Sequence, residues 1–228
     1  MIANPSKFYS GVALMAAFLV VLVVMFLPVF SGQNALNFMD SLYNSISKGS
    51  AYYISDLKAE AEGRRGTSIT VNLEMASDAQ CDKTASLFEA AGASVEVDGG
   101  QLRINGDLGA ILDRCLGDAD EMFANKGEGI RARYGYEERR ALYNWWTALK
   151  AMDRDLSRQS RFPEAAFVAK VNKKAVECAY NYYGIEPQRI TEKIGVVLFS
   201  LIFYVLYTVW YGYAIIFMFE GWGLKLTH

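Results

Sequence analysis

The chain has 228 residues, of which 23 are basic and 25 acidic, and its formal net charge at neutral pH is −2. A chain this close to neutrality has no strong field for nucleic acid, so we expect no nucleic-acid partner. The 52% apolar content is an average over two populations, because the apolar residues are concentrated near the two ends.

Two long runs without a charged residue lie near the ends of the chain. Phe8–Phe30 has 23 residues and Ile194–Phe219 has 26, whereas about 20 apolar residues suffice to cross the hydrocarbon core of a bilayer. The first run is longer than the apolar core of a signal peptide, and no Ala-x-Ala-like cleavage site follows it. We therefore predict two transmembrane helices, both in contact with the lipid bilayer.

The basic residues that flank these runs bear on orientation. Lys7 precedes the first run and no basic residue follows it before Lys48, which favours cytoplasmic termini. Arg189 and Lys193, beside the second run, favour the opposite orientation. Because the first span usually dominates and long loops cross largely regardless of charge, we expect cytoplasmic termini and an exported central domain. The expected location is a bacterial inner membrane.

Residues 31–62 are expected to form an amphipathic helix and a linker. Met39 and Leu42 belong to an apolar series at helical spacing, and Gly49 is a place where the helix can break. Such a helix packs on a domain or lies in the headgroup layer. Ala61–Gly66 contains two glycines and is typical of a linker, so we expect the compact domain to begin after it.

The next segment, 67–127, begins with a strand and a helix. Apolar and polar residues alternate over Ile69–Met75, which is the period of a strand with one buried face. Ser77 followed by Gln80 forms a capping box, and a helix is expected over 78–91.

A hairpin and a second helix complete the 67–127 segment. Gly99-Gly100 between two short alternating runs predicts a tight hairpin turn, and Asp107 is placed to cap a helix that ends near Gly127. The order is β-α-β-β-α, a truncated ferredoxin-like module in a membrane α+β protein. The hairpin residues expected to face the core are Val95, Val97, Leu102 and Ile104.

Residues 134–186 have a helical pattern only. Two apolar stripes at helical spacing lie on either side of Pro163, which is suited to the first turn of a helix. They predict an antiparallel helical hairpin. Pro187 can open the helix that becomes the second span.

Few residues offer chemistry. The only histidine is His228, so a histidine-based triad within the central domain is ruled out, and we expect no metal and no cofactor. Cys81 and Cys115 are a candidate disulfide, and the alternative is that both are buried thiols. Cys81 is also the one candidate nucleophile, because it lies near the start of its helix. No catalytic constellation is found, so we expect a protein that is not an enzyme.

Two charged groups of the central domain are expected to be ordinary solvated faces. The carboxylates Asp118, Asp120 and Glu121 have the spacing of the polar side of a helix. The second group is a basic cluster diluted by neighbouring glutamates, and its members are Arg131, Arg133, Arg139 and Arg140.

The second apolar run carries aromatic residues where a simple anchor has none. Aromatic belts lie at the two membrane interfaces, and a phenol in hydrocarbon lacks a hydrogen-bond partner. These residues therefore predict a helix that faces protein, either the first span or a further membrane partner. A flat apolar ligand such as a quinone or pigment is the alternative to a further partner. The predicted contact residues are Tyr204, Tyr207, Trp210, Tyr211 and Tyr213.

The pattern favours an accessory or scaffold subunit of a larger membrane complex. Its expected partners are other membrane subunits or further copies of the chain, together with a soluble extracytoplasmic protein. The alternative is a ligand-sensing or transport-assisting membrane protein that uses the exported domain as its binding module.

The orientation can be tested by chemical labelling. A membrane-impermeant, cysteine-specific reagent applied to intact cells should label a cysteine introduced near Gly99 and should not label one introduced near Met1, because only the central domain is expected outside. The opposite labelling pattern would reverse the orientation.

Overall fold

The computed structural model describes residues 2–224. The chain divides into two compact units. The terminal unit consists of Met1–Gly49 and Pro187–His228, and the central unit consists of Ser50–Glu186. His228 and Lys225 lie outside the described residues.

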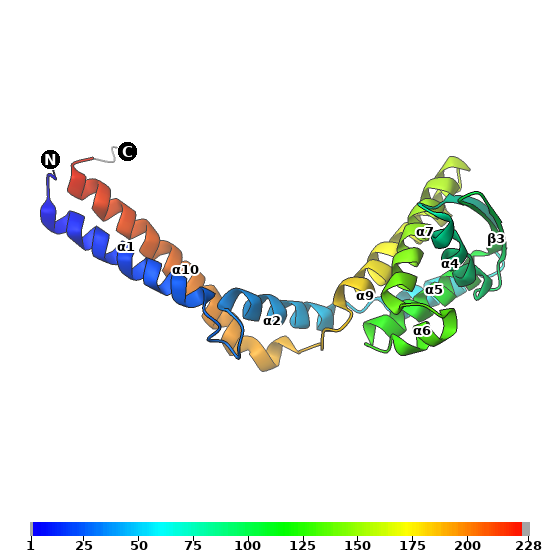
Figure 1. Cartoon of the computed structure of the whole chain (residues 1–228), viewed down its shortest axis with the longest axis horizontal. Coiled ribbons are helices and arrows are strands. Elements are labelled where there is room, and N and C mark those ends of the chain that lie inside the picture. Colours follow the sequence, from blue (N-terminus) through cyan, green and yellow to red (C-terminus); the bar gives the residue numbers. More distant parts are fainter. Residues whose placement is uncertain (1, 225–228) are drawn as a thin grey trace. The chain divides into compact units, whose positions relative to one another are not determined.

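Two helices of the terminal unit are long and apolar enough to cross a membrane: α1 (Pro5–Phe26) and α10 (Ile190–Trp222). Their most apolar stretches are 6% and 0% buried, so they are not core helices of a soluble domain. They lie side by side, and the start of α1 is next to the end of α10 (Figure 1).

The ends of these helices follow from their local sequence. The side chain of Asn4 accepts a hydrogen bond from the Lys7 amide at 3.1 Å, and Pro5 occupies the first turn, so α1 begins before the uncharged run does. α1 ends at Phe26, two residues before Pro28. α10 ends where Gly223 adopts a φ of +97°.

The third helix of the terminal unit is α2 (Ala35–Ser50). It is joined to the α10 segment by two hydrogen bonds. The Tyr43 and Ser200 hydroxyls are 2.7 Å apart, and the Gln188 amide donates to the Ser45 carbonyl at 3.1 Å. The helix ends close to the predicted break at Gly49.

The central unit contains a three-stranded antiparallel sheet in the order β1-β3-β2, formed by Ser68–Glu74, Gln101–Asp107 and Ser94–Asp98. Val71 pairs with Ile104, which also pairs with Val95. One face of the sheet is buried under helices and the other is exposed. A small sheet within a mostly helical chain is therefore present, but the ferredoxin-like likeness is not established.

Turn and cap residues act largely as their sequence indicates. Gly99 and Gly100 connect β2 to β3 with φ values of +48° and +83°. Asp107 caps α5 (Leu108–Phe123) by accepting from the Ala110 amide at 2.7 Å. Ser77 caps α4 (Asp78–Glu89).

Some details of this region differ from expectation. The side chain of Gln80 does not close a capping box. Its Nε2 donates to Asn144 Oδ1 at 3.4 Å inside the core. Val97 shares the inner face of the sheet but is 50% exposed, because β2 is an edge strand and Val97 lies near its end. α5 ends at Phe123 and not near Gly127.

The remaining helices complete the core. α3 (Ile54–Glu62) packs on α5, and α6 (Glu128–Tyr134) is a short helix that sequence reasoning did not assign. α7 (Glu138–Arg158) pairs with a helix built from α8 (Phe162–Val171), the π turn η1 (Asn172–Val176) and α9 (Glu177–Tyr182).

The compact unit begins earlier than its predicted linker. Ile54, Leu57 and Ala61 of α3 are at most 2% exposed, because they pack into the same core as the sheet and α5. Residues 67–127 are therefore not a closed module. Their sheet is covered partly by α7, which contacts β1.

The outer edge of β1 is also closed by α7 and the turn after it. Asp155 accepts from the Asn72 amide at 3.0 Å, Gln159 donates to the Thr70 carbonyl at 2.9 Å, and Arg161 donates to the Ser68 carbonyl at 2.9 Å. These side chains occupy backbone groups that another strand would otherwise pair with.

This packing predicts which fragment folds. Residues 50–186 expressed alone should give a circular dichroism spectrum of mixed helix and strand and unfold cooperatively in urea, because the fragment contains a whole core. The shorter fragment 67–127 should not unfold cooperatively, because it lacks α3 and α7. Equal cooperativity of the two fragments would contradict this assignment of the core.

Candidate functional site

The close approach of α1 and α10 depends on two glycines. A methyl group on Gly11 would lie 2.6 Å from the Met218 amide nitrogen, and one on Gly221 would overlap the backbone of Phe8. Both glycines are buried. Small residues of this kind let helix backbones pack closely where no water drives association.

An ion pair joins the same helices at one end. Lys7 Nζ is 2.8 Å from Glu220 Oε2, and the two side chains are 53% and 40% exposed. At this exposure the pair contributes little stability, but it fixes which residues of the two helices face each other.

Two of the five predicted contact residues are directed at α1. The Tyr207 hydroxyl donates to the Phe18 carbonyl at 3.3 Å, and Trp210 Nε1 donates to the Leu14 carbonyl at 3.1 Å. The rings of Phe18 and Tyr207 stack with centroids 4.2 Å apart. The polar atoms of Tyr207 and Trp210 are thus satisfied within the chain.

The other three predicted contact residues are on the exposed surface of α10. Tyr204 is 68% exposed, Tyr213 is 55% exposed and Tyr211 is 44% exposed. The ring of Tyr211 still touches Phe18, with centroids 5.1 Å apart. Within residues 2–224 none of the three hydroxyls makes a hydrogen bond, so in hydrocarbon each would need a partner from outside the chain.

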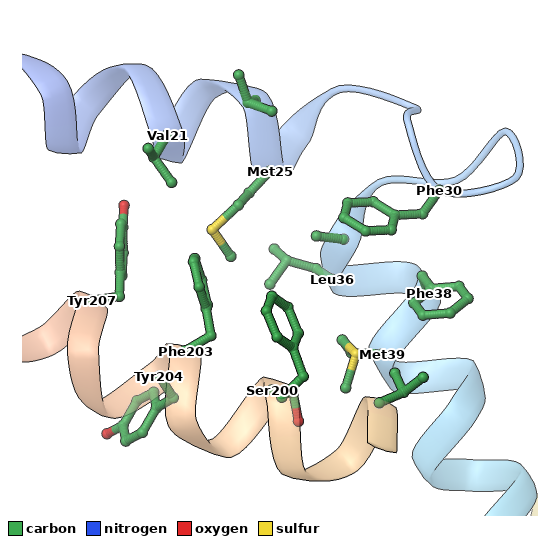
Figure 2. A pocket seen from close by; sticks show the side chains of 14 residues that line it. Val21, Met25, Phe30, Leu36, Phe38, Met39, Ser200, Phe203, Tyr204 and Tyr207 are labelled. Atoms are coloured by element: carbon green, nitrogen blue, oxygen red, sulfur yellow. The ribbon is translucent and has the colours of Figure 1, made fainter. Parts of the chain in front are cut away.

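A cavity of about 390 Å³ lies where α1 ends against α10 and the start of α2. Figure 2 shows Val21 and Met25 of α1 facing Phe203 and Tyr207 of α10 across it. The loop after α1 and the start of α2 line another side of the cavity. The residues that they contribute are Phe30, Ala35, Leu36, Phe38 and Met39. Its volume and its apolar, aromatic lining are those of a small-molecule site.

The polar atoms around this cavity are already engaged or turned away. The Ser200 hydroxyl donates to the Val197 carbonyl at 2.8 Å and is bonded to Tyr43. The Tyr207 hydroxyl is bonded to Phe18, and Tyr204 is directed away from the cavity (Figure 2). The cavity therefore offers a ligand contact area but no hydrogen bond.

The central unit is organised around a buried carboxylate. Asp118 is 0% exposed and accepts hydrogen bonds from Arg114 at 2.7 Å, Arg133 at 2.8 Å, Tyr134 at 2.5 Å and Trp145 at 2.8 Å. Burial, followed by the nearby Asp118 charge, raises the pKa of Tyr134, so this phenol stays protonated and donates.

The expectation of two solvated faces is therefore wrong for part of each group. Asp118 is the buried centre of a network, and Arg133 links it to Glu121 at 2.7 Å. Asp120 pairs with Lys58 at 2.6 Å. Each of these carboxylates is thus engaged by a cation, and the group forms a structural network.

The two cysteines of the candidate disulfide are free, buried thiols in the structure. They lie on helices with different main neighbours, since α4 packs on α7 and β2, whereas α5 packs on α3 and α9. Burial and then the Asp78 and Asp82 charges raise the pKa of Cys81, and burial raises that of Cys115. Raised pKa values keep the thiols protonated, which opposes a nucleophilic role.

Sequence reasoning missed the cavity and the buried network. The cavity residues on α2 were visible only as an amphipathic stripe, and their meeting with α10 depends on tertiary structure. The signal for the network was the presence of Trp145, Tyr134 and two arginines near one helix, but only the fold shows that they converge on Asp118.

Three comparisons with known proteins found no match to this chain. No family model, curated protein or solved structure matches it.

The network predicts a large loss of stability when its centre is removed. Asp118→Ala should lower the free energy of unfolding of the 50–186 fragment by about 3–5 kcal/mol, because buried donors including two cations lose their acceptor. Asp113→Ala on the same helix is the matched control: its carboxylate is 48% exposed and pairs with Arg65, so its loss should cost less than about 1 kcal/mol. Similar urea midpoints for the two variants would contradict the assigned role of Asp118.

Proposed function

We propose that the chain is a non-catalytic accessory subunit of a larger membrane protein assembly. In this proposal α1 and α10 cross the bilayer as a hairpin, and the face of α10 that carries Tyr204 and Tyr211 docks on another membrane subunit or a second copy of the chain. The central unit lies on the extracytoplasmic side of a bacterial inner membrane and contacts a soluble partner. As part of the same proposal, the β-α-β-β-α region of the central unit is a truncated ferredoxin-like module.

The observation that carries this proposal is the distribution of phenols on α10. Tyr207 and Trp210 use their polar atoms on α1, whereas Tyr204, Tyr211 and Tyr213 have none of theirs paired within residues 2–224. Lipid chains cannot pair a hydroxyl, so a tyrosine at this depth favours a protein neighbour that supplies an acceptor. A plain anchor would place these rings at its two ends instead.

The polar groups of the central unit are engaged in its own structure. The buried carboxylate is saturated with donors, and the thiols have raised pKa values. Within residues 2–224, no group of three or more potential metal ligands gathers.

A binding role for the central unit remains the second candidate. It is favoured by a groove of about 1010 Å³ between β1 and α7, where Glu74, Arg154 and Arg158 meet. Both signs of charge line it, which suits a polar ligand or a peptide better than a simple anion. The groove adjoins the end of β1 that α7 does not close.

The docking face can be tested by mutation. Replacing Tyr204 and Tyr211, which lie seven residues apart on one face of α10, together with Leu should weaken association, because two interhelical hydrogen bonds of about 0.6 kcal/mol each amount to roughly sevenfold in affinity. Membrane insertion should persist, since leucine is favourable in the bilayer. The measurement is the yield of partner subunits that co-purify in mild detergent, with native mass determination of the complex.

The matched control replaces Val205 and Val209, which are also exposed on α10, with Leu. This pair should leave the partner yield unchanged. A wild-type chain that is extracted as a stable monomer, or equal partner yields for the two double variants, would overturn the docking proposal.

A further inference from the structure

The side chains that line the apolar cavity of the terminal unit limit the kinds of ligand that can bind there. A quinone ring requires hydrogen-bond donors for its carbonyl oxygens, and a metal-containing pigment requires an axial ligand. The lining has no unengaged donor for a quinone, because Ser200 and Tyr207 are already bonded, and its only side chains able to ligate a pigment metal are the thioethers of Met25 and Met39. What fits an apolar cavity beside two candidate spans is a hydrocarbon chain.

A second, polar cavity adjoins the first. It has a volume of about 130 Å³ and shares the lining residues Phe38 and Val196 with the apolar cavity. The polar side chains that line it come from α2 and from the start of the α10 segment: Ser41, Ser45, Gln188 and Lys193. A molecule with an apolar chain and a polar end could occupy both spaces at once.

Two side chains of the polar cavity are unsatisfied in the structure. Lys193 makes no ion pair within residues 2–224, and neither Glu192, which precedes it, nor Asp40, which precedes the lining residue Ser41, lines the cavity. Gln188 Oε1 is buried without a hydrogen-bond partner. A buried polar atom without a partner is costly, which points to a group that is missing from the cavity.

The start of α10, the helix that carries Lys193, also bears on the charge of the ligand. α10 begins at Ile190 without a side-chain cap, so the unbonded amides of its first turn and the positive end of its dipole favour an anion, whereas the Glu192 carboxylate in the same turn opposes one. A lysine ammonium together with a helix start is a common combination for phosphate.

We propose that the two cavities together bind one glycerophospholipid. One acyl chain lies in the apolar cavity between α1, α10 and α2, and the phosphate lies beside Lys193. The hydroxyl-bearing glycerol and headgroup region lies near Ser41 and Gln188. The site is formed within the terminal unit and does not depend on the docking face of α10.

The test uses the full chain, purified in mild detergent and examined by native mass spectrometry. Dioleoyl phosphatidylglycerol carries both the chain and the phosphate, dioleoylglycerol carries only the chain, and glycerol 3-phosphate carries only the phosphate. We expect the wild-type chain to retain phosphatidylglycerol about fivefold better than dioleoylglycerol, the effect of one lysine near a membrane anion. Glycerol 3-phosphate should not displace the lipid.

Two variants with matched controls separate the two parts of the site. Val21→Trp fills the apolar cavity and should abolish most lipid retention, whereas Val20→Trp, on the exposed side of α1, should not. Lys193→Gln should remove the preference for phosphatidylglycerol over dioleoylglycerol and keep the chain bound. Arg189→Gln, an exposed charge outside both cavities, should keep the preference.

Several results would overturn the proposal. They are equal lipid retention by Val21→Trp and Val20→Trp, an unchanged preference in Lys193→Gln, displacement by glycerol 3-phosphate alone, or co-purification of a quinone in place of a phospholipid. The Lys193 comparison stands by itself if the tryptophan variant fails to fold, because Lys193 is only partly buried and is not among the residues packed between α1 and α10.

Discussion

The terminal unit depends on the close antiparallel contact of α1 with α10. Gly11 and Gly221 let the two backbones approach, and this approach places Tyr207 and Trp210 within hydrogen-bonding distance of α1 carbonyls. The contact involves residues about 200 positions apart in the chain. It thereby determines which side chains of α10 are turned inward and which are left on the surface, and it creates the cavity where the shorter helix ends.

The two units provide hydrogen-bond partners for their inward polar side chains in different ways. In the central unit, the cost of burying the Asp118 charge is offset by several donors from three helices, and the same network joins α5, α6 and α7. In the terminal unit, the inward polar atoms of Tyr207 and Trp210 donate to carbonyls in the interior of α1. The outward phenols of α10 have no hydrogen-bond acceptor within residues 2–224. The functional proposal rests on these phenols.

Local signals in the sequence predicted local structure well. Gly99-Gly100, Ser77, Asp107 and Pro163 each stand at the turn or helix start that their chemistry favours. What could not be predicted depends on distant packing. The α3 helix was separated from the core because its glycine-containing neighbour resembles a linker. Asp118 was assigned to a solvated face because three of its four donors, Arg133, Tyr134 and Trp145, come from other helices. The cavity is invisible for the same reason, since α2 and α10 are far apart in sequence.

The difference in length between the two long helices has a mechanical consequence. At 1.5 Å per residue α1 is about 33 Å long, close to the thickness of a hydrocarbon core, and α10 is about 50 Å long. The close backbone contacts at Gly11 and Gly221 set the register of the two helices and oppose their sliding past each other to match a thinner or thicker bilayer. In the proposed membrane setting the pair responds to thickness by tilting as one rigid body. The excess length of α10 converts that tilt into a sideways displacement of its first turn, where Lys193 lies.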